Sequence, residues 1–164
     1  MRKTAAGKIA LGGILAALAM VIMCLVGIIP VATFVCPALC TFLCSIVYRL
    51  CERRVAWAWY GTVSVLAALM GPDKEAAAVF LFLGYYPIIK SWFDKRSFSF
   101  VFKLAYFNTV VVCMYALLIS ALGMQQIARE YMELGYIGLG AFVILGNVSF
   151  FLLDKLLQTL GRLR

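Results

Sequence analysis

Two asparagines lie within long apolar stretches of this sequence, where polar side chains are rare. Asn108 falls within the uncharged stretch 104–128, and Asn147 within the stretch 134–153. A side-chain amide both donates and accepts hydrogen bonds, so two of them can hold a small polar solute, with Tyr115 as a further polar group nearby. The two amides can equally bond each other, and the sequence leaves both interpretations open.

Further polar groups come at the ends of the apolar stretches. Glu75 lies in the short segment 71–75 and Arg129 in the longer segment 124–135, and we expect both at the rim of a solute site that opens outward. Tyr85 is a further candidate for this site. Segments exposed to water are usually polar, so these residues alone do not distinguish a solute-binding site from ordinary solvent-exposed loops.

Three of the six cysteines, Cys36, Cys40 and Cys44, recur at every fourth position and so share one side of a helix. Such a stripe could pass a soft metal ion, but the chain has no histidine and no CxxC pair, and cysteine packs well as a small apolar residue. We therefore expect no metal and no cofactor. The lack of histidine and of a GxxxxGKS/T phosphate loop removes the commonest catalytic arrangements, so we expect no enzyme.

These polar groups are set in a chain with the composition of a membrane protein. Of 164 residues, 65% are hydrophobic and 13% charged, whereas a soluble domain is nearer to half apolar and a quarter charged. Because about 20 apolar residues cross the hydrocarbon core as a helix, the sequence predicts an all-α integral membrane protein, a single membrane domain over residues 1–164. Its six transmembrane helices are expected at approximately 7–29, 31–50, 55–71, 76–93, 98–123 and 134–160. Pro87 is expected to kink the fourth helix.

The basic residues predict the orientation of these helices. With six spans, both termini lie on one side, and thirteen of the fifteen Lys and Arg residues fall on that side. By the positive-inside rule both termini are expected in the cytoplasm, as in a multi-pass protein of the cell membrane. The net charge of +8 is then explained by anionic lipid, and we expect no nucleic-acid partner. On the same side lie Lys90 and Asp154, for which a structural ion pair is the favoured role over a proton relay.

Small residues form a continuous stripe along the first predicted helix, at Ala6, Ala10, Gly13 and Ala17. Small residues let two helix backbones approach closely, which is a main packing device inside a bilayer. The stripe can therefore dock a partner helix or pack inside the protein, and a parallel stripe through Gly12 and Ala16 offers the same choice.

The whole pattern resembles the substrate-binding S components of energy-coupling factor (ECF) transporters. The stretches that carry the resemblance are KIALGGILAALA at 8–19, the Ile29-Pro30 turn, and GYYPIIK at 84–90 followed by Asn108. The small-residue face here, Gly13-x-x-x-Ala17 beside Ala6-x-x-x-Ala10, departs from the strict alanine motif of that family.

The resemblance implies a subunit that captures a vitamin or other micronutrient through its last three helices and outer loops. Its partners would be a transmembrane coupling subunit that docks on the first helix and separate ATPase subunits. The alternative is a scaffold that binds no solute and resembles the rod-shape-determining MreD family, whose members also have six short spans. The identity of the solute stays open.

Overall fold

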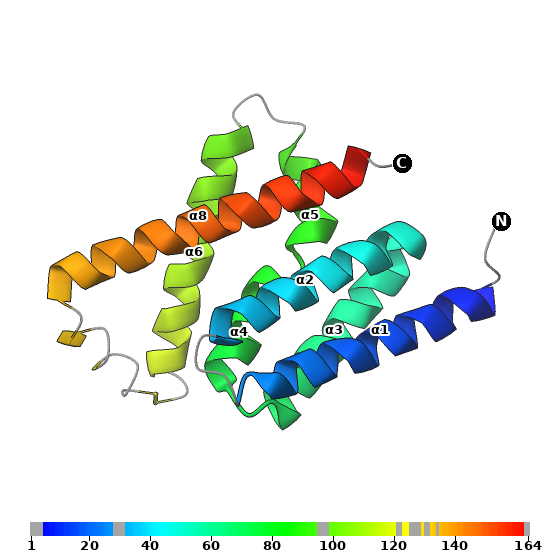
Figure 1. The fold of residues 1–164 in the computed structure, drawn as a ribbon, viewed down its shortest axis with the longest axis horizontal. Helices are drawn as coiled ribbons and strands as arrows, with labels where there is room; N and C mark the ends of the chain where they lie inside the picture. The colour runs from blue at the N-terminus through cyan, green and yellow to red at the C-terminus, as the bar shows by residue number, and fades with distance from the viewer. Residues whose placement is uncertain are drawn as a thin grey trace. The chain divides into compact units, whose positions relative to one another are not determined.

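A computed structural model describes residues 5–27, 32–94, 99–120, 123–124, 129, 132–133 and 135–162. The described residues form helices and no strands (Figure 1). Among these residues, four helical segments are long and apolar enough to cross a membrane: Ala6–Leu25, Ala32–Leu50, Phe100–Ser120 and Gly135–Thr159. The expectation of an all-helical chain is confirmed for the described residues, and these four segments are candidates for membrane-spanning helices. The helices form two compact units, Met1–Arg96 and Ser97–Arg164, which are described separately.

The first unit is built on α1 (Ala5–Leu25), α2 (Ala32–Leu50) and α3 (Arg53–Met70). Small residues permit close packing here, since Ala19, Ala56 and Ala67 are fully buried in the shared core. Two cysteines of the stripe on α2, Cys40 and Cys44, are fully buried in the same core, whereas Cys36 belongs to a separate buried cluster. The Cys40 thiol donates a weak hydrogen bond to the Ala19 carbonyl of α1 (3.5 Å). Among the described residues, no group of three or more His, Cys, Asp or Glu could hold a metal ion.

The predicted helix 55–71 corresponds to α3, but α3 is not among the four apolar segments. Arg53 and Arg54 occupy its first turn, and tryptophan and tyrosine follow in the next two, which together lower its hydropathy. Its last turn ends at Met70, beside a tight connection to the next helix.

The fourth predicted span, 76–93, is not one helix. It consists of α4 (Lys74–Leu83) and α5 (Tyr86–Phe93), of 10 and 8 residues, so each is only about 12 to 15 Å long and too short to cross a bilayer alone. The break falls at Gly84, where an added Cβ would lie 2.5 Å from the Phe80 carbonyl oxygen. Pro87 follows at the start of α5, where its missing N–H costs nothing. The predicted kink is therefore a full interruption of the helix.

A hydroxyl group from α3 donates a hydrogen bond to a backbone carbonyl group at this break. The Tyr60 hydroxyl donates a hydrogen bond to the Leu81 carbonyl, one turn before α4 gives way to α5. Freed carbonyls are costly in an apolar medium unless a neighbouring helix supplies a donor. Tyr60 thus ties α3 to the interrupted helix.

The connection between α3 and α4 is held by its own charged residues. Asp73 caps α4, with Oδ1 accepting from the backbone N–H groups of Glu75 (2.8 Å) and Ala76 (3.3 Å), and Oδ2 accepts from the Thr33 hydroxyl of α2 (2.9 Å). The Lys74 ammonium donates to the Ala68 carbonyl at the end of α3 (2.9 Å). Residues 72–74 therefore join the ends of three helices.

The second unit contains α6 (Ser99–Ser120) and α8 (Gly135–Arg162). Their bounds lie within three residues of the predicted ranges 98–123 and 134–160. The two helices cross (Figure 1). The described contacts join residues 100–108 of α6 to residues 146–154 of α8. Phe107 and Phe150 stack at this crossing, with ring centroids 4.6 Å apart. The Phe107 ring also lies against Gly146, where an added Cβ would be 3.7 Å away.

Candidate functional site

Asn108 and Asn147, the two asparagines of the apolar stretches, contact each other where α6 and α8 cross. Asn108 Nδ2 donates to Asn147 Oδ1 (2.9 Å), and Asn147 Nδ2 donates back to Asn108 Oδ1 (3.2 Å). Each amide uses its second N–H within its own helix, Asn108 to the Leu104 carbonyl (2.9 Å) and Asn147 to the Val143 carbonyl (2.8 Å). All four amide N–H groups are thus bonded, and of the two interpretations that the sequence left open, the structure shows the one in which the side chains bond each other.

This arrangement leaves the solute-binding role of the pair as a prediction. Each amide oxygen accepts one bond from its partner and has a second lone pair. A solute could donate to these oxygens without disturbing the pair, whereas a solute that accepts hydrogen bonds would have to replace one of the bonds already made.

The other predicted site residues fall in different places. Tyr115 is half-buried on α6, two turns beyond Asn108 on the same face, and Arg129 is exposed. Glu75 is half-buried in the first turn of α4, and Tyr85 is half-buried at the break between α4 and α5. Glu75 and Tyr85 belong to the first unit and the remaining residues to the second.

Tyr85 is part of an aromatic cluster with Trp57 and Tyr60 of α3. Its ring stacks on that of Trp57 (centroids 6.1 Å apart) and meets that of Tyr60 edge to face (5.7 Å). Through these contacts Trp57 and Tyr60 brace the helix break. Because the rings contact one another, binding at Tyr85 would use the outer faces of the cluster.

The second unit holds a buried ion pair that the sequence did not predict as such. Asp154 of α8 pairs with Lys103 of α6, with Oδ2 and Nζ 3.1 Å apart and side chains 8% and 7% exposed. Gln158, one turn along α8, donates to the same carboxylate oxygen (3.0 Å). From the sequence a structural ion pair was favoured for Asp154, with Lys90 named beside it, whereas the partner that the structure shows is Lys103. Lys90, the other expected participant, lies 5.7 Å from the Tyr86 ring centroid.

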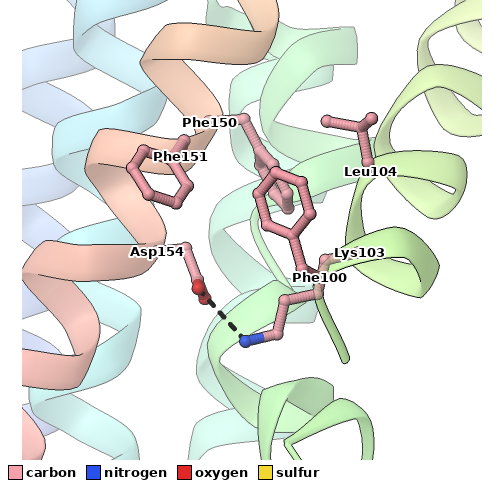
Figure 2. A pocket seen from close by; sticks show the side chains of 6 residues that line it. All are labelled: Phe100, Lys103, Leu104, Phe150, Phe151 and Asp154. Atoms are coloured by element: carbon pink, nitrogen blue, oxygen red, sulfur yellow. Dashed lines mark hydrogen bonds and ion pairs between the residues drawn. The ribbon is translucent and has the colours of Figure 1, made fainter. Parts of the chain in front are cut away.

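A shallow hollow with a cavity volume of about 20 Å³, room for about one water molecule, adjoins this ion pair. Its walls are apolar except for the two charged groups, and Figure 2 shows the pair below the phenylalanine rings. The lining residues are Phe100, Lys103, Leu104, Phe150, Phe151 and Asp154. Phe100 and Phe151 touch edge to face (5.9 Å) and are 60% and 39% exposed, so the hollow opens on an apolar surface.

The two small-residue stripes of α1 face in different directions. Gly12 is buried, with Val55 of α3 beside the position of an added Cβ (3.9 Å). Gly13 is exposed, and nothing lies within 4 Å of the corresponding position. Ala6, Ala10 and Ala17 are exposed on the same side as Gly13. The stripe predicted for docking is therefore not the one that packs inside the first unit.

At the start of α1, an ion pair joins the helix to the connection between α2 and α3. Lys8 Nζ lies 2.7 Å from Glu52 Oε1. The hydrogen bond from the Lys8 ammonium, and then its charge, lower the pKa of the Glu52 carboxyl. The pair fixes the end of α1 without covering its outward stripe.

A comparison of the chain with protein-family models found no match, and comparisons with curated proteins and with solved structures found none either.

Proposed function

We propose that this protein is the membrane-embedded substrate-binding subunit of an uptake system for a vitamin or similar micronutrient. It would work with a transmembrane coupling subunit and separate ATPase subunits, as the resemblance to ECF S components implies. The observation that carries the proposal is the outward small-residue stripe of α1, formed by Ala6, Ala10, Gly13 and Ala17.

The chemistry of α1 supports docking of a helix on this stripe. An α1 that only faced lipid would need no small residues there, because lipid chains adapt to any side chain. Large apolar residues flank the stripe, with Ile9 and Ile14 69% and 68% exposed. They leave a shallow channel along the small residues in which a second helix can approach closely.

Solute capture is the second half of the proposal. The amide oxygens of Asn108 and Asn147 and the half-buried hydroxyl of Tyr115 lie along one face of the second unit. They favour a solute that carries hydrogen-bond donors and enough apolar surface to leave water for a membrane protein. Arg129, Glu75 and Tyr85 remain proposed rim residues.

One observation favours the alternative, a scaffold that binds no solute. Within the described residues the asparagine pair has all its N–H groups bonded, and the hollow described above lies beside the ion pair instead of beside the amides. A scaffold would use the α1 stripe equally well. The two functions therefore differ in what the second unit does and agree on α1.

The matched variants Gly12→Leu and Gly13→Leu test the docking role. The same added volume enters the core in the first and the outward stripe in the second. We expect Gly13→Leu to keep its thermal stability and lose co-purification of ATPase-bearing partners, whereas Gly12→Leu should lose stability. Unchanged co-purification in Gly13→Leu would contradict docking on this stripe.

Equilibrium binding of radiolabelled vitamins to the purified protein separates the transporter subunit from the scaffold. Saturable binding of one vitamin supports solute capture. Partner co-purification without binding of any vitamin supports the scaffold.

A further inference from the structure

The connection between α2 and α3 carries an excess of positive charge. Lys8, Arg49, Arg53 and Arg54 lie at or beside this connection, and Glu52 supplies the carboxylate there. The Lys8 ammonium occupies that carboxylate (2.7 Å), and Arg49 Nε donates to a serine hydroxyl one turn back on α2 (3.4 Å). The two arginines in the first turn of α3 remain as the freely exposed charges.

Neither of these arginines has a carboxylate close by. Within the part of the chain that the structure describes, Arg53 and Arg54 take part in no ion pair, and the charge of Arg54 acts on Glu52 more weakly than that of Lys8 does. Two cations in the first turn also oppose the helix dipole, whose positive end lies there. The stability of α3 therefore does not explain why both residues are basic.

The exposed face of α3 becomes apolar one turn beyond the arginines. Trp57 lies three residues after Arg54 and is 39% exposed, and Val65 and Leu69 follow on the same face with 57% and 74% exposed. Aliphatic side chains of this kind belong in hydrocarbon, and tryptophan is enriched where hydrocarbon meets the lipid headgroups. In a membrane-embedded chain, this order of residues sets the two guanidinium groups at the level of the lipid phosphates.

We propose that the exposed guanidinium groups of Arg53 and Arg54 form a docking site for an anionic phospholipid such as phosphatidylglycerol, with Trp57 beneath its headgroup. Guanidinium binds phosphate through paired hydrogen bonds, and the net negative charge of the lipid offsets the excess of positive charge at the connection. A zwitterionic lipid brings the same phosphate together with an ammonium group, which the arginines repel. The proposal rests on the membrane location that the proposed function shares with its scaffold alternative, and it is independent of solute binding and of docking on α1.

The position of the arginines favours a lipid over an acidic protein segment. Trp57 and the aliphatic residues that follow it on the exposed face need an apolar neighbour, which the acyl chains of the same lipid supply. An acidic segment of a partner protein would match the charge of the arginines and leave this apolar continuation uncovered. One phospholipid complements both parts of the surface.

Quenching of tryptophan fluorescence by brominated lipids tests the site in the full chain reconstituted into bilayers. Trp59 is buried (5% exposed), and Trp92→Phe removes the other exposed tryptophan (58%), so Trp57 becomes the reporter. The bilayers contain phosphatidylglycerol and phosphatidylcholine in a fixed ratio, with bromine on the acyl chains of one lipid or the other. We expect phosphatidylglycerol to be preferred at Trp57 by about 5- to 30-fold, the effect of one or two arginines at an anionic surface.

Two double variants separate this site from the overall charge of the protein. Arg53→Gln with Arg54→Gln should reduce the preference to within about twofold, and it should not lower thermal stability, because it removes two cations from the positive end of the helix dipole. The matched control, Arg129→Gln with Lys155→Gln, removes the same charge from two exposed positions of the second unit and should keep the preference. A preference that persists in the first variant, or that is lost in the control, would overturn the site.

The remaining outcomes each identify what is wrong. Equal quenching by the two labelled lipids would overturn the site and leave the membrane location intact, whereas no quenching by either lipid would overturn both. Equal quenching, together with loss of co-purified protein partners in the arginine variant, would assign the arginines to an acidic protein surface. Glycerophosphoglycerol, which has the same headgroup without acyl chains, should compete at least about tenfold more weakly than the lipid, and equal competition would overturn the assignment to a lipid.

Discussion

Substituting the paired asparagines, singly and together, probes the contact that holds α6 to α8. Asn108→Leu removes both interhelical hydrogen bonds, of 2.9 and 3.2 Å, and leaves Asn147 with one N–H and one oxygen unmatched. Asn147→Leu does the same to Asn108. Leucine is close to asparagine in size, so the lost hydrogen bonds are the main effect of either change.

The magnitude follows from what each variant leaves unpaired. Interhelical hydrogen bonds in membrane proteins average about 0.6 kcal/mol, so the two bonds contribute about 1.2 kcal/mol. An orphaned amide in a partly buried position adds about 1 kcal/mol. Each single variant should therefore lower the free energy of unfolding by about 1 to 3 kcal/mol. The double variant orphans no amide and should be no less stable than the worse single variant.

Equilibrium unfolding of the unaltered protein, both single variants and the double variant in mixed detergent micelles gives a complete double-mutant cycle. We expect a coupling energy of about 1 to 2 kcal/mol between the two positions. If the two single effects simply add in the double variant, to within about 0.5 kcal/mol, the reciprocal pair is not what stabilises the crossing. Repeating the melts with candidate vitamins then tests binding, because a solute held by these amides loses its stabilising effect in all three variants.

Two further predictions concern the first unit. Gly84→Ala should destabilise it by about 1 to 3 kcal/mol in a thermal melt, because the added Cβ meets the Phe80 backbone and ring. The control Gly61→Ala, whose added Cβ has nothing within 4 Å, should be neutral or stabilising. The same melting temperature for both variants would contradict the close packing at Gly84. The hydrogen bond and charge of Lys8 lower the pKa of the Glu52 carboxyl in the folded protein, so the stabilisation that this pair provides is fully present above the ordinary glutamate pKa of 4.5 and is lost as the pH falls through the lower folded-state pKa. The stability difference between unaltered protein and Glu52→Gln should thus be small at pH 7 and vanish at strongly acidic pH, and a difference that grows on acidification would contradict this linkage.

Local composition was sufficient to predict the long helices. The first and last predicted helices, 7–29 and 134–160, agree with α1 and α8 to within four residues at each end. Apolar length and the absence of charge decide such elements, and neither depends on the rest of the fold. The stripe on α1 was also visible from its spacing, but two parallel stripes were equally small, and only packing against Val55 separates them.

The interrupted helix and the ion-pair partner could not be predicted in the same way. Pro87 was a visible signal of a kink, yet the break also involves the Tyr60 hydroxyl of α3, which donates to the Leu81 carbonyl. Similarly, Asp154 had several basic residues available on its predicted side. Its pairing with Lys103 follows from where α6 and α8 cross, which no local pattern records.

The spacing of that ion pair along the chain also matters for biogenesis. Lys103 and Asp154 are 51 residues apart, and translation proceeds at about 5 to 20 residues per second. For roughly 3 to 10 s after α6 is made, Lys103 has no Asp154 to pair with, and its ammonium must reach back to the membrane surface. If the chain spans the membrane as proposed, synthesis of α8 ends this interval and allows α6 to settle at its final depth. A ribosome that stalls before Asp154 would then leave a nascent chain whose Lys103 has no carboxylate partner at the membrane.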